Sequence, residues 1–407
     1  MKKLILLGGN FESIPTILEA KKEFKVIVVD KNPTAPGFKH TSLKIFESIF
    51  DYRAIIKILK KKRYAQISGV LCASTDAPMS VYEIGKYLKF HYYSYKTANF
   101  FSNKYLMKKE LKRKGVLVPW FKKITNLSEI ENILEKDKNK KFVLKPCDSR
   151  GGRGIFLINY KTKNLYNLYK ETKSFTKLNY LIIEEFIEGE QYSTETIIYK
   201  NHYFTPGFCR RNYNKTKKYY PSIIENGGDQ PIKLKESIKK NITNLIQVTG
   251  KISGLKNGII KGDIVLSKNK KAYIIEVACR LSGGWFSSHQ IPQATGVNVI
   301  KAAIKLSSFQ KINLNSLRIK YQKAVGIRYF FPKIGKIKKI FLPKNLKTKK
   351  NIIKLMFFKK KGDVVQQVRS HPDRVGFVIL KEKSKSQLMK KLNYFVNRVK
   401  IDTFKIN

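Results

Sequence analysis

The first hundred residues alternate short apolar runs with amphipathic segments, and this alternation constrains the fold more than any other feature of the chain. The apolar runs predict buried strands at Leu4–Leu7, Val26–Val29 and Gly69–Ala73. The amphipathic segments between them predict helices at Ser13–Lys22 and about Tyr52–Lys62. Strands that alternate with helices in this way are typical of a parallel, doubly wound sheet.

Small and polar residues follow each of these predicted strands. Gly8 and Gly9 follow the first strand, Asp30 follows the second, and the segment 74–76 (Ser, Thr, Asp) follows the third. The carboxyl ends of parallel strands meet at one rim, where such sheets bind ligands, so we expect these residues to lie together. A dinucleotide site is not indicated, because the segment from Gly8 lacks the GxGxxG spacing.

The chain is strongly basic, with 83 Lys and Arg against 29 Asp and Glu and a net charge of +54 at pH 7. A polyanionic partner is one explanation, and a proteome biased toward lysine is the other. Lysine is spread over the whole chain instead of forming a patch, which favours the second explanation. We therefore expect no specific nucleic-acid partner, only salt-sensitive binding to polyanions.

The distribution of apolar residues and cysteines fits a reducing, cytoplasmic location. The sequence has no run of about 18 apolar residues, so it predicts no membrane span. The apolar run at the N-terminus breaks at Gly8, before it reaches the length of a secretion signal. The four cysteines show neither a CxxC pair nor zinc-site spacing.

A glycine-rich basic loop follows the apolar segment Phe142–Leu144, and its sequence from Lys145 to Gly154 is KPCDSRGGRG. Its glycines permit positive φ and close backbone approach, so several N–H groups can converge on a phosphate while its lysine and arginines add charge. The loop matches neither the GxxxxGK[ST] nor the GxGxxG pattern. An ordinary hairpin turn has the same composition, so the loop alone does not identify a phosphate site.

Two adjacent acids end the predicted strand in the sequence YLIIEEFIEG, which begins at Tyr180. Neighbouring side chains of a strand point to opposite faces, so at most one of Glu184 and Glu185 faces a given cleft. The sequence therefore does not predict a paired-carboxylate catalyst at this position.

The segment 258–284 predicts a β-hairpin that carries two acids. Strands around Ile260–Leu266 and Ala272–Val277 flank a lysine-rich turn, and Asp263 and Glu276 lie at similar distances from it. The hairpin can place these acids side by side, where Mg²⁺ and nucleotide phosphates would offset their repulsion. A cross-strand pair of surface acids is the alternative. Arg280, four residues after the second acid, offers a guanidinium fork to an anion.

Residues 320–407 predict a lysine-rich unit with no evident chemistry. Strand patterns occur around Ala324–Phe331 and Asp363–Val368, the largely apolar segment 373–379 follows, and a helix pattern runs from about Ser386 to Val399. We expect a small α+β closing domain.

In their order along the chain, these motifs resemble the ATP-grasp proteins of the carbamoyl-phosphate-synthase-like group, which is related to biotin carboxylase and the amino-acid ligases. The resemblance rests on NKYLMKKELKRKGVLVP, KPCDSRGGRG, IIEEFIEGEQYSTE, GDIVL and IIEVACRLSGG. It implies a mixed α/β and α+β fold in three domains. These are a Rossmann-like domain at 1–102, a two-lobed ATP-grasp domain at 103–315 with lobes 103–187 and 188–315, and a C-terminal closing domain at 316–407.

The resemblance also implies a role for individual residues. The residues that would bind ATP are Lys104, Lys145, Ser149, Gly151, Gly152, Gly154, Glu184, Glu185, Phe186, Ile187 and Glu195. Among them the two lysines would contact phosphates, the loop residues would close over them, and the four residues from Glu184 would hold adenine. Asp263 and Glu276 would bridge Mg²⁺. Arg280 and Lys145 would act in catalysis, with Arg280 stabilising an acyl phosphate.

The activity implied is that of a Mg·ATP-dependent ligase, which activates a small-molecule carboxylate as an acyl phosphate for attack by an amine. Ala278 stands where many members have an Asn that completes metal coordination, so a second metal ion is not implied. Two alternatives stay open: a bicarbonate-activating carboxylase of the biotin-carboxylase or purine-pathway type, and an ATP-binding protein without turnover. Homodimers are common in the family and are compatible with this interpretation.

Overall fold

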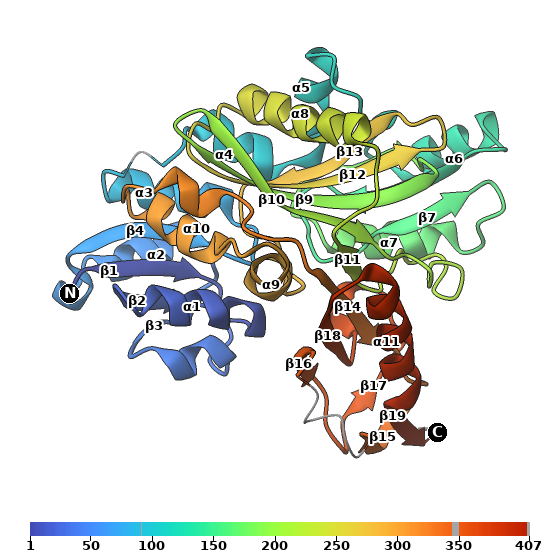
Figure 1. Cartoon of the computed structure of the whole chain (residues 1–407). Coiled ribbons are helices and arrows are strands. Elements are labelled where there is room, and N and C mark those ends of the chain that lie inside the picture. Colours follow the sequence, from blue (N-terminus) through green and yellow to red (C-terminus); the bar gives the residue numbers. More distant parts are fainter. Residues whose placement is uncertain (91, 344–349, 405–407) are drawn as a thin grey trace.

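The computed structural model describes residues 1–90, 92–343 and 350–404 (Figure 1). Its N-terminal region contains a parallel sheet, as the alternating pattern predicts, and the sheet has a fourth strand, at Leu43–Ile45, that this pattern did not predict. The strands are β1 (Lys3–Leu7), β2 (Lys25–Val29), β3 (Leu43–Ile45) and β4 (Ile67–Cys72), in the order β3-β2-β1-β4. The rim that we expected is confirmed, since Gly9 donates its N–H to Asp30 at 2.8 Å and the Thr75 hydroxyl donates to the Leu7 carbonyl at 2.7 Å.

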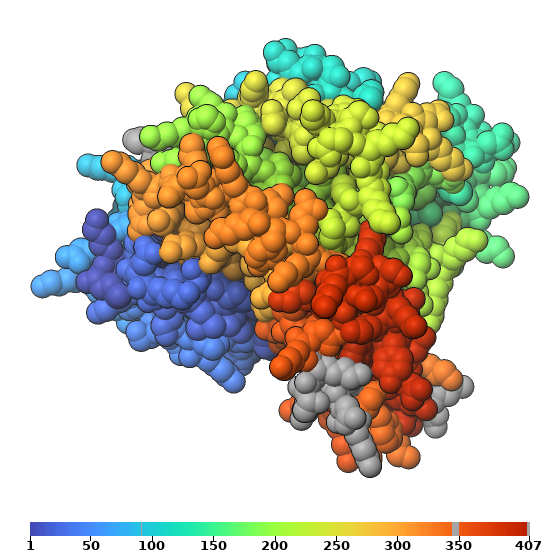
Figure 2. Space-filling model, in the orientation of Figure 1, coloured from blue at the N-terminus to red at the C-terminus, as the bar shows by residue number. Residues whose placement is uncertain are grey.

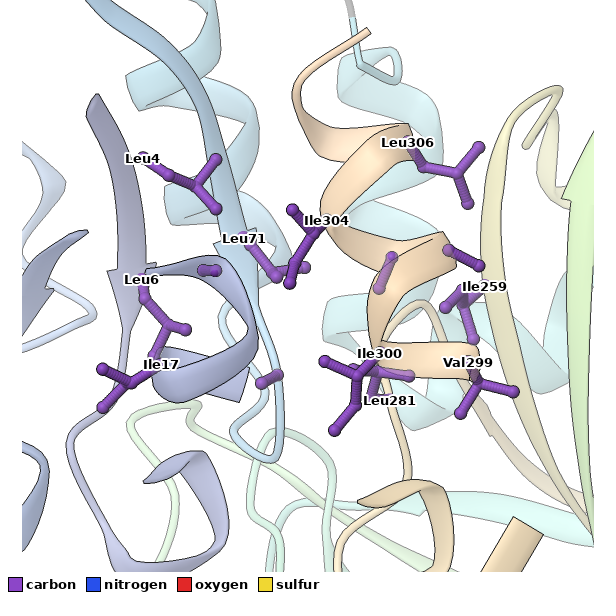
Figure 3. Packing of buried hydrophobic residues seen from close by; sticks show 14 of the residues in the cluster. Leu4, Leu6, Ile17, Leu71, Ile259, Leu281, Val299, Ile300, Ile304 and Leu306 are labelled. Atoms are coloured by element: carbon purple, nitrogen blue, oxygen red, sulfur yellow. The ribbon is translucent and has the colours of Figure 1, made fainter. Parts of the chain in front are cut away.

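Alternate side chains of β1 enter two different cores, because successive residues of a strand point to opposite faces. Ile5 and Leu7 pack on one face with helices α2 (Tyr52–Leu59) and α3 (Pro78–Tyr87). On the other face, Leu4 and Leu6 pack with α1 (Ile14–Ala20) and α10 (Val299–Ser307) (Figure 3).

Helix α10 reaches this sheet from almost 300 residues along the chain, and β4 accommodates it with a glycine. A Cβ on Gly69 would lie 1.9 Å from the Ser307 carbonyl oxygen, so no side chain fits there. Figure 2 shows the N-terminal residues in blue and the residues near 300 in orange as one continuous surface.

A second sheet follows, in the order β5-β8-β6-β7. Its strands are β5 (Phe121–Ile124), β6 (Lys141–Pro146), β7 (Phe156–Asn159) and β8 (Leu181–Glu185). The helices of this part of the chain are α4 (Tyr95–Ser102), α5 (Lys104–Arg113), α6 (Leu127–Lys136) and α7 (Leu165–Ser174). The glycine-rich loop connects β6 to β7, which form the antiparallel pair expected for a strand that runs out and returns.

The largest sheet is antiparallel and has eight strands, in the order β13-β12-β9-β10-β11-β14-β18-β16. Its first five members are β13 (Ala272–Ala278), β12 (Gly258–Ser267), β9 (Gly189–Tyr199), β10 (His202–Arg211) and β11 (Gly228–Gln230). Its last three members are β14 (Ala324–Phe330), β18 (Gly376–Glu382) and β16 (Ile352–Phe357). Helix α8 (Glu236–Ser253) packs against β12, and α11 (Lys385–Arg398) packs against β14 and β18.

The C-terminal strands therefore extend the central sheet through the pairing of β11 with β14. A small sheet of order β17-β15-β19 completes this region, with strands β15 (Gly335–Phe341), β17 (Val364–Val365) and β19 (Lys400–Phe404). A short helix, α9 (Ile291–Thr295), precedes α10. The mixed α/β and α+β fold is confirmed. The domain boundaries at 102, 187 and 315 stay predictions, because one core cluster and one sheet run across them.

No helix of the described residues is long and apolar enough to cross a membrane.

Candidate functional site

A cavity of about 610 Å³ lies where the N-terminal, central and C-terminal regions meet. Its walls combine the strand rim of the first sheet, the glycine-rich loop, the end of β8, the β12–β13 hairpin and a turn before β18. The predicted site residues that line it are Lys104, Lys145, Ser149, Gly151, Gly152, Glu184, Glu185, Phe186, Ile187, Asp263, Glu276 and Arg280. Two predicted residues, Gly154 and Glu195, lie outside the lining.

At one end of the cavity, two lysines share one buried carboxylate. Glu184, at the end of β8, is 2.8 Å from the Nζ of Lys145 and 3.3 Å from the Nζ of Lys108. All three side chains are almost completely buried. Burial lowers the pKa of Lys108 to about 8, although Glu184 acts in the opposite direction. The second carboxylate oxygen of Glu184 is buried and has no hydrogen-bond partner within the described chain.

Lys104 is held by the geometry of its helix start. The Asn103 side chain caps α5, and the Lys104 Nζ donates to the Ser149 carbonyl at 2.6 Å and lies 3.1 Å from Glu276. Burial opposes the charged form, but Glu276 outweighs it and raises the pKa of Lys104. This lysine is therefore a buried ammonium group that joins the loop to the hairpin.

The glycine-rich loop has the backbone that its glycines predict. Gly151, Gly152 and Gly154 have φ values of +68°, +74° and +65°, which L-residues rarely adopt. The first two line the cavity, whereas a Cβ on Gly154 would lie 2.8 Å from the ring of Phe175, below the loop. Gly154 therefore lets the loop pack on α7, and the structure gives it no contact with the cavity.

The loop is contacted from both neighbouring regions. Arg150 donates to the Asp76 carbonyl and lies 3.9 Å from the centre of the Phe50 ring, both in the N-terminal region. On the other side, the His371 N–H donates to the Gly151 carbonyl at 3.1 Å. The position of the loop thus depends on segments that lie far before and far after it in the sequence.

The predicted hairpin places its two acids directly opposite each other. Asp263 and Glu276 are register partners in the β12–β13 ladder, with a bulge immediately after Asp263. The Lys261 ammonium pairs with one Asp263 oxygen, and the Ser193 hydroxyl donates to the other at 2.6 Å. Burial opposes ionisation of Asp263, but Lys261 outweighs it and lowers the pKa. Asp263 is therefore a carboxylate.

These acids fit a Mg²⁺ ion that is shared with phosphates. Among the described residues, no group of three His, Cys, Asp or Glu side chains could hold a metal ion by itself. A pair of carboxylates is what Mg²⁺ usually takes from a protein when phosphate oxygens and water supply the other ligands. Ala278 is buried and offers no side-chain oxygen.

Arg280 differs from the expectation of a free anion-binding fork. Its Nε and one terminal nitrogen donate to the two Asp76 oxygens, each at 2.7 Å, and the other terminal nitrogen donates to the Leu281 carbonyl at 2.9 Å. Burial opposes ionisation of Asp76, but Arg280 dominates and lowers its pKa to about 2. The bidentate pair ties the first sheet to the end of β13.

Glu195, which the resemblance places among the ATP-binding residues, does not line the cavity. Its carboxylate is fully buried and accepts from the Ser282 N–H at 2.9 Å and from the hydroxyls of Ser282 and Ser287. Burial raises its pKa despite these hydrogen bonds. Its contacts are those of a residue that holds the turn after Arg280.

Sequence reasoning missed part of the cavity wall. The C-terminal region, which showed no evident chemistry, contributes Phe358, His371, Pro372 and Arg374 to the lining, and η1 (Phe11–Ser13) contributes Glu12. Burial, followed by Arg374, keeps the pKa of His371 well below its usual value, so its imidazole is neutral. No motif marked these residues, because they are single residues from distant segments that only the fold brings to the cavity.

Two protein families match the chain. Residues 101–284 match the family described as ATP-grasp domain, and residues 328–403 match L-amino acid ligase C-terminal domain 2. These two matches include the loop, the hairpin and most of the C-terminal wall. No curated protein sequence matches the chain significantly.

Solved structures share the fold over nearly the whole chain. L-amino acid ligase from Bacillus licheniformis has a TM-score of 0.82 at 17% identity, covering 100% of this chain and 99% of its own. Phosphoribosylglycinamide synthetase from Anaerococcus prevotii has a TM-score of 0.75 at 23% sequence identity, and the match covers 99% of this chain and 100% of the synthetase. Biotin carboxylase from Campylobacter jejuni has a TM-score of 0.72 at 17% sequence identity, and the match covers 99% of this chain and 92% of the carboxylase. These likenesses show that the chain has their fold.

Proposed function

We propose, from the match of residues 101–284 to the ATP-grasp domain, that this chain is a Mg·ATP-dependent ligase that joins a carboxylate to an amine and releases ADP and phosphate. The observation that carries the proposal is the cavity itself. The ATP-grasp segment and the L-amino acid ligase C-terminal segment both line it, and its walls hold lysines, a carboxylate pair and a glycine-rich loop.

The finer proposal is that both substrates are amino acids, which form a dipeptide. The match at residues 328–403 supports it, as does the fold shared with an L-amino acid ligase. We also propose a cytoplasmic location, which suits four free cysteines.

The residues at one end of the cavity suit adenine and phosphates. The unpartnered oxygen of Glu184 can accept a hydrogen bond from an exocyclic amine such as that of adenine. Lys104 and Lys145 are buried beside Glu276 and Glu184, and their ammonium groups would offset phosphate charge. The N–H groups of the loop at 149–154 complete the phosphate site.

The reaction has two transfers. A carboxylate oxygen of the first substrate attacks the γ-phosphorus of ATP, and the bond to the ADP oxygen breaks. The amine nitrogen of the second substrate then attacks the carbonyl carbon, the carbon–oxygen bond to phosphate breaks, and the nitrogen loses a proton. Asp263 and Glu276 would hold Mg²⁺, which supplies charge neutralisation for the phosphates when bound. The protein mainly positions the reactants and neutralises charge.

The test is a substrate-pair screen. The purified protein is incubated with Mg·ATP and all pairs of the common amino acids; ADP is followed by a coupled assay and products by mass spectrometry. We expect ADP release that needs both partners, with a product of their summed mass minus water. ADP release that responds only to bicarbonate would instead indicate a carboxylase, and ATP binding without ADP release under any condition would contradict the ligase proposal.

A further inference from the structure

Beyond the nucleotide end, the cavity contains two buried arginines that share one acid. Arg211, at the end of β10, is 3.5 Å from Glu225, and Arg374, just after η6 (His371–Asp373), is 3.8 Å from the same carboxylate oxygen. The two arginine side chains are less than a tenth exposed, and all three residues line the cavity. One carboxylate therefore serves two guanidinium groups, at distances longer than those of a good ion pair.

Both guanidinium groups keep donors available. Arg211 uses its Nε on the Ser193 hydroxyl at 2.8 Å. Arg374 uses its Nε on the His371 carbonyl at 2.8 Å and one terminal nitrogen on the Glu225 carbonyl at 3.4 Å. Within the described chain, the second terminal nitrogen of each arginine has no hydrogen-bond partner. A buried cation with unused donors is costly unless an anion joins it.

The surrounding groups hold this pair in place. Arg374 lies over the ring of Tyr329 at 3.8 Å, and Arg211 lies over the ring of Phe286 at 5.1 Å. The guanidinium group of Arg280, by contrast, already forms a bidentate pair with Asp76. Arg211 and Arg374 therefore keep donors for an anion, whereas Arg280 does not.

An acid faces the same space from the N-terminal region. The Glu12 carboxylate lies against the turn at 283–284, where a Cβ on Gly283 would be 2.4 Å from its oxygen. Among the described residues, no cation is within ion-pair distance of it. Glu12 lines the same cavity as the two arginines, so the space offers polar partners to both a carboxylate and an amino group of one molecule.

We infer that Arg211 and Arg374 form a carboxylate subsite that binds a free substrate carboxylate beside the phosphate site. The inference rests on the proposed ligase function for its substrate class. The carboxylate has two sources: the acid that is phosphorylated, or the free carboxylate of the amine donor. The subsite is built by the L-amino acid ligase C-terminal segment and the ATP-grasp segment together.

The first test measures binding without turnover. Isothermal titration with Mg·ADP present compares L-alanine, L-methionine and L-phenylalanine with their α-amides, which lack the carboxylate. We expect at least one acid to bind more tightly than its amide. Arg374→Met and Arg211→Met should each weaken binding of that acid by about 10- to 100-fold and leave the amide unchanged. The matched control is Arg398→Met, an exposed arginine over Tyr394 at the end of α11.

The second test uses the substrate pair found in the screen and compares KM with kcat. A raised KM for the amine donor, but not for its amide, assigns the carboxylate to the donor; a raised KM for the acid assigns it to the activated substrate. Thermal melting checks that the variants fold, and Arg374→Lys should restore binding partly because it keeps the charge but not the fork.

Two outcomes would overturn the subsite. One is the absence of carboxylate-dependent binding by the unmodified protein in all three pairs; the other is a loss of ATP affinity alone in both arginine variants. Carboxylate-dependent binding without ADP release would instead keep the subsite and contradict the ligase function.

Discussion

At the residue scale, the carboxylate pair of the hairpin gives the most direct prediction. Glu276→Gln removes one proposed Mg²⁺ ligand and also the partner of Lys104. We expect kcat for ADP formation to fall by about 100-fold or more while the nucleotide still binds. Steady-state ADP release and nucleotide titration measure the two effects. Glu188→Gln is the control, because Glu188 is half exposed and pairs with Lys141 and Lys268. Unchanged turnover in Glu276→Gln would show that Glu276 is not a metal ligand that the reaction needs.

Lys108 gives a prediction about pH. Its pKa is about 8 in the folded protein and returns to 10.5 on unfolding. Between these pH values the unfolded chain binds a proton that the folded chain does not, so this lysine makes stability rise with pH. The parent should therefore gain stability relative to Lys108→Met between pH 8 and 10.5, and the difference should be constant below about pH 7.

Urea unfolding at a series of pH values measures this difference. Lys109→Met, at an exposed neighbouring position of α5, is the control. A parent-minus-variant difference that does not change between pH 8 and 10.5 would show that Lys108 keeps an ordinary pKa.

Some of the site could be predicted from the sequence because its geometry is local. The opposition of Asp263 and Glu276 follows from equal distances to one turn, and the hairpin register confirms it. Other contacts have no local signal. The Asp76–Arg280 pair joins residues 204 positions apart, and Arg374 reaches a partner 149 positions away. A chain with 83 basic residues offers too many equivalent arginines and lysines for such pairings to be predicted.

At the element scale, a substitution in the glycine-rich loop should affect both stability and turnover, whereas a comparable substitution outside the loop should affect stability alone. Gly152→Ala places a side chain at φ +74°, with its Cβ 3.4 Å from the His371 ring. The control, Gly115→Ala, places a side chain at a similar φ of +76°, and its Cβ has no other atom within 4 Å. Each substitution should cost about 1–2 kcal/mol of stability. Only Gly152→Ala should also lower kcat, by roughly tenfold, because the proposed role of this loop is to close over phosphates.

Thermal melting and steady-state kinetics on the two variants test this difference. Equal kcat values in Gly152→Ala and Gly115→Ala would show that the loop does not need this glycine to close.

The elements also show what periodicity predicts. The parallel strands, the hairpin and helix α11 were predicted because each has a regular pattern of apolar residues. The predicted strand at Asp363–Val368 is only the two-residue β17, because its central residues pair briefly with β15 and then leave the sheet. The joining of β11 to β14 was not predicted, since a three-residue strand carries almost no periodic signal.

At the scale of the whole molecule, the C-terminal region should not be separable from the rest. In a chain that ends at residue 315, β11 would lose its partner β14, and Trp285 would lose its packing on Phe358 and Phe377. The cavity would also lose Arg374. We expect the truncated chain to lose its cooperative thermal transition and its nucleotide binding.

Circular dichroism melting and nucleotide titration measure both properties. Adding the segment 316–407 as a separate chain is the control, and it should restore them in part. A cooperative transition with unchanged nucleotide affinity in the truncated chain would show that the C-terminal region is an independent unit.

The position of α10 has a consequence for how the protein is made. Leu4, Leu6 and Leu71 pack in one cluster with α1 and with a helix that begins at Val299, so part of this face of the first sheet stays uncovered until that helix has left the ribosome. At about 5–20 residues per second, the interval between β4 and α10 is on the order of ten seconds or more. During synthesis the nascent chain therefore carries a partly uncovered apolar sheet face for this interval.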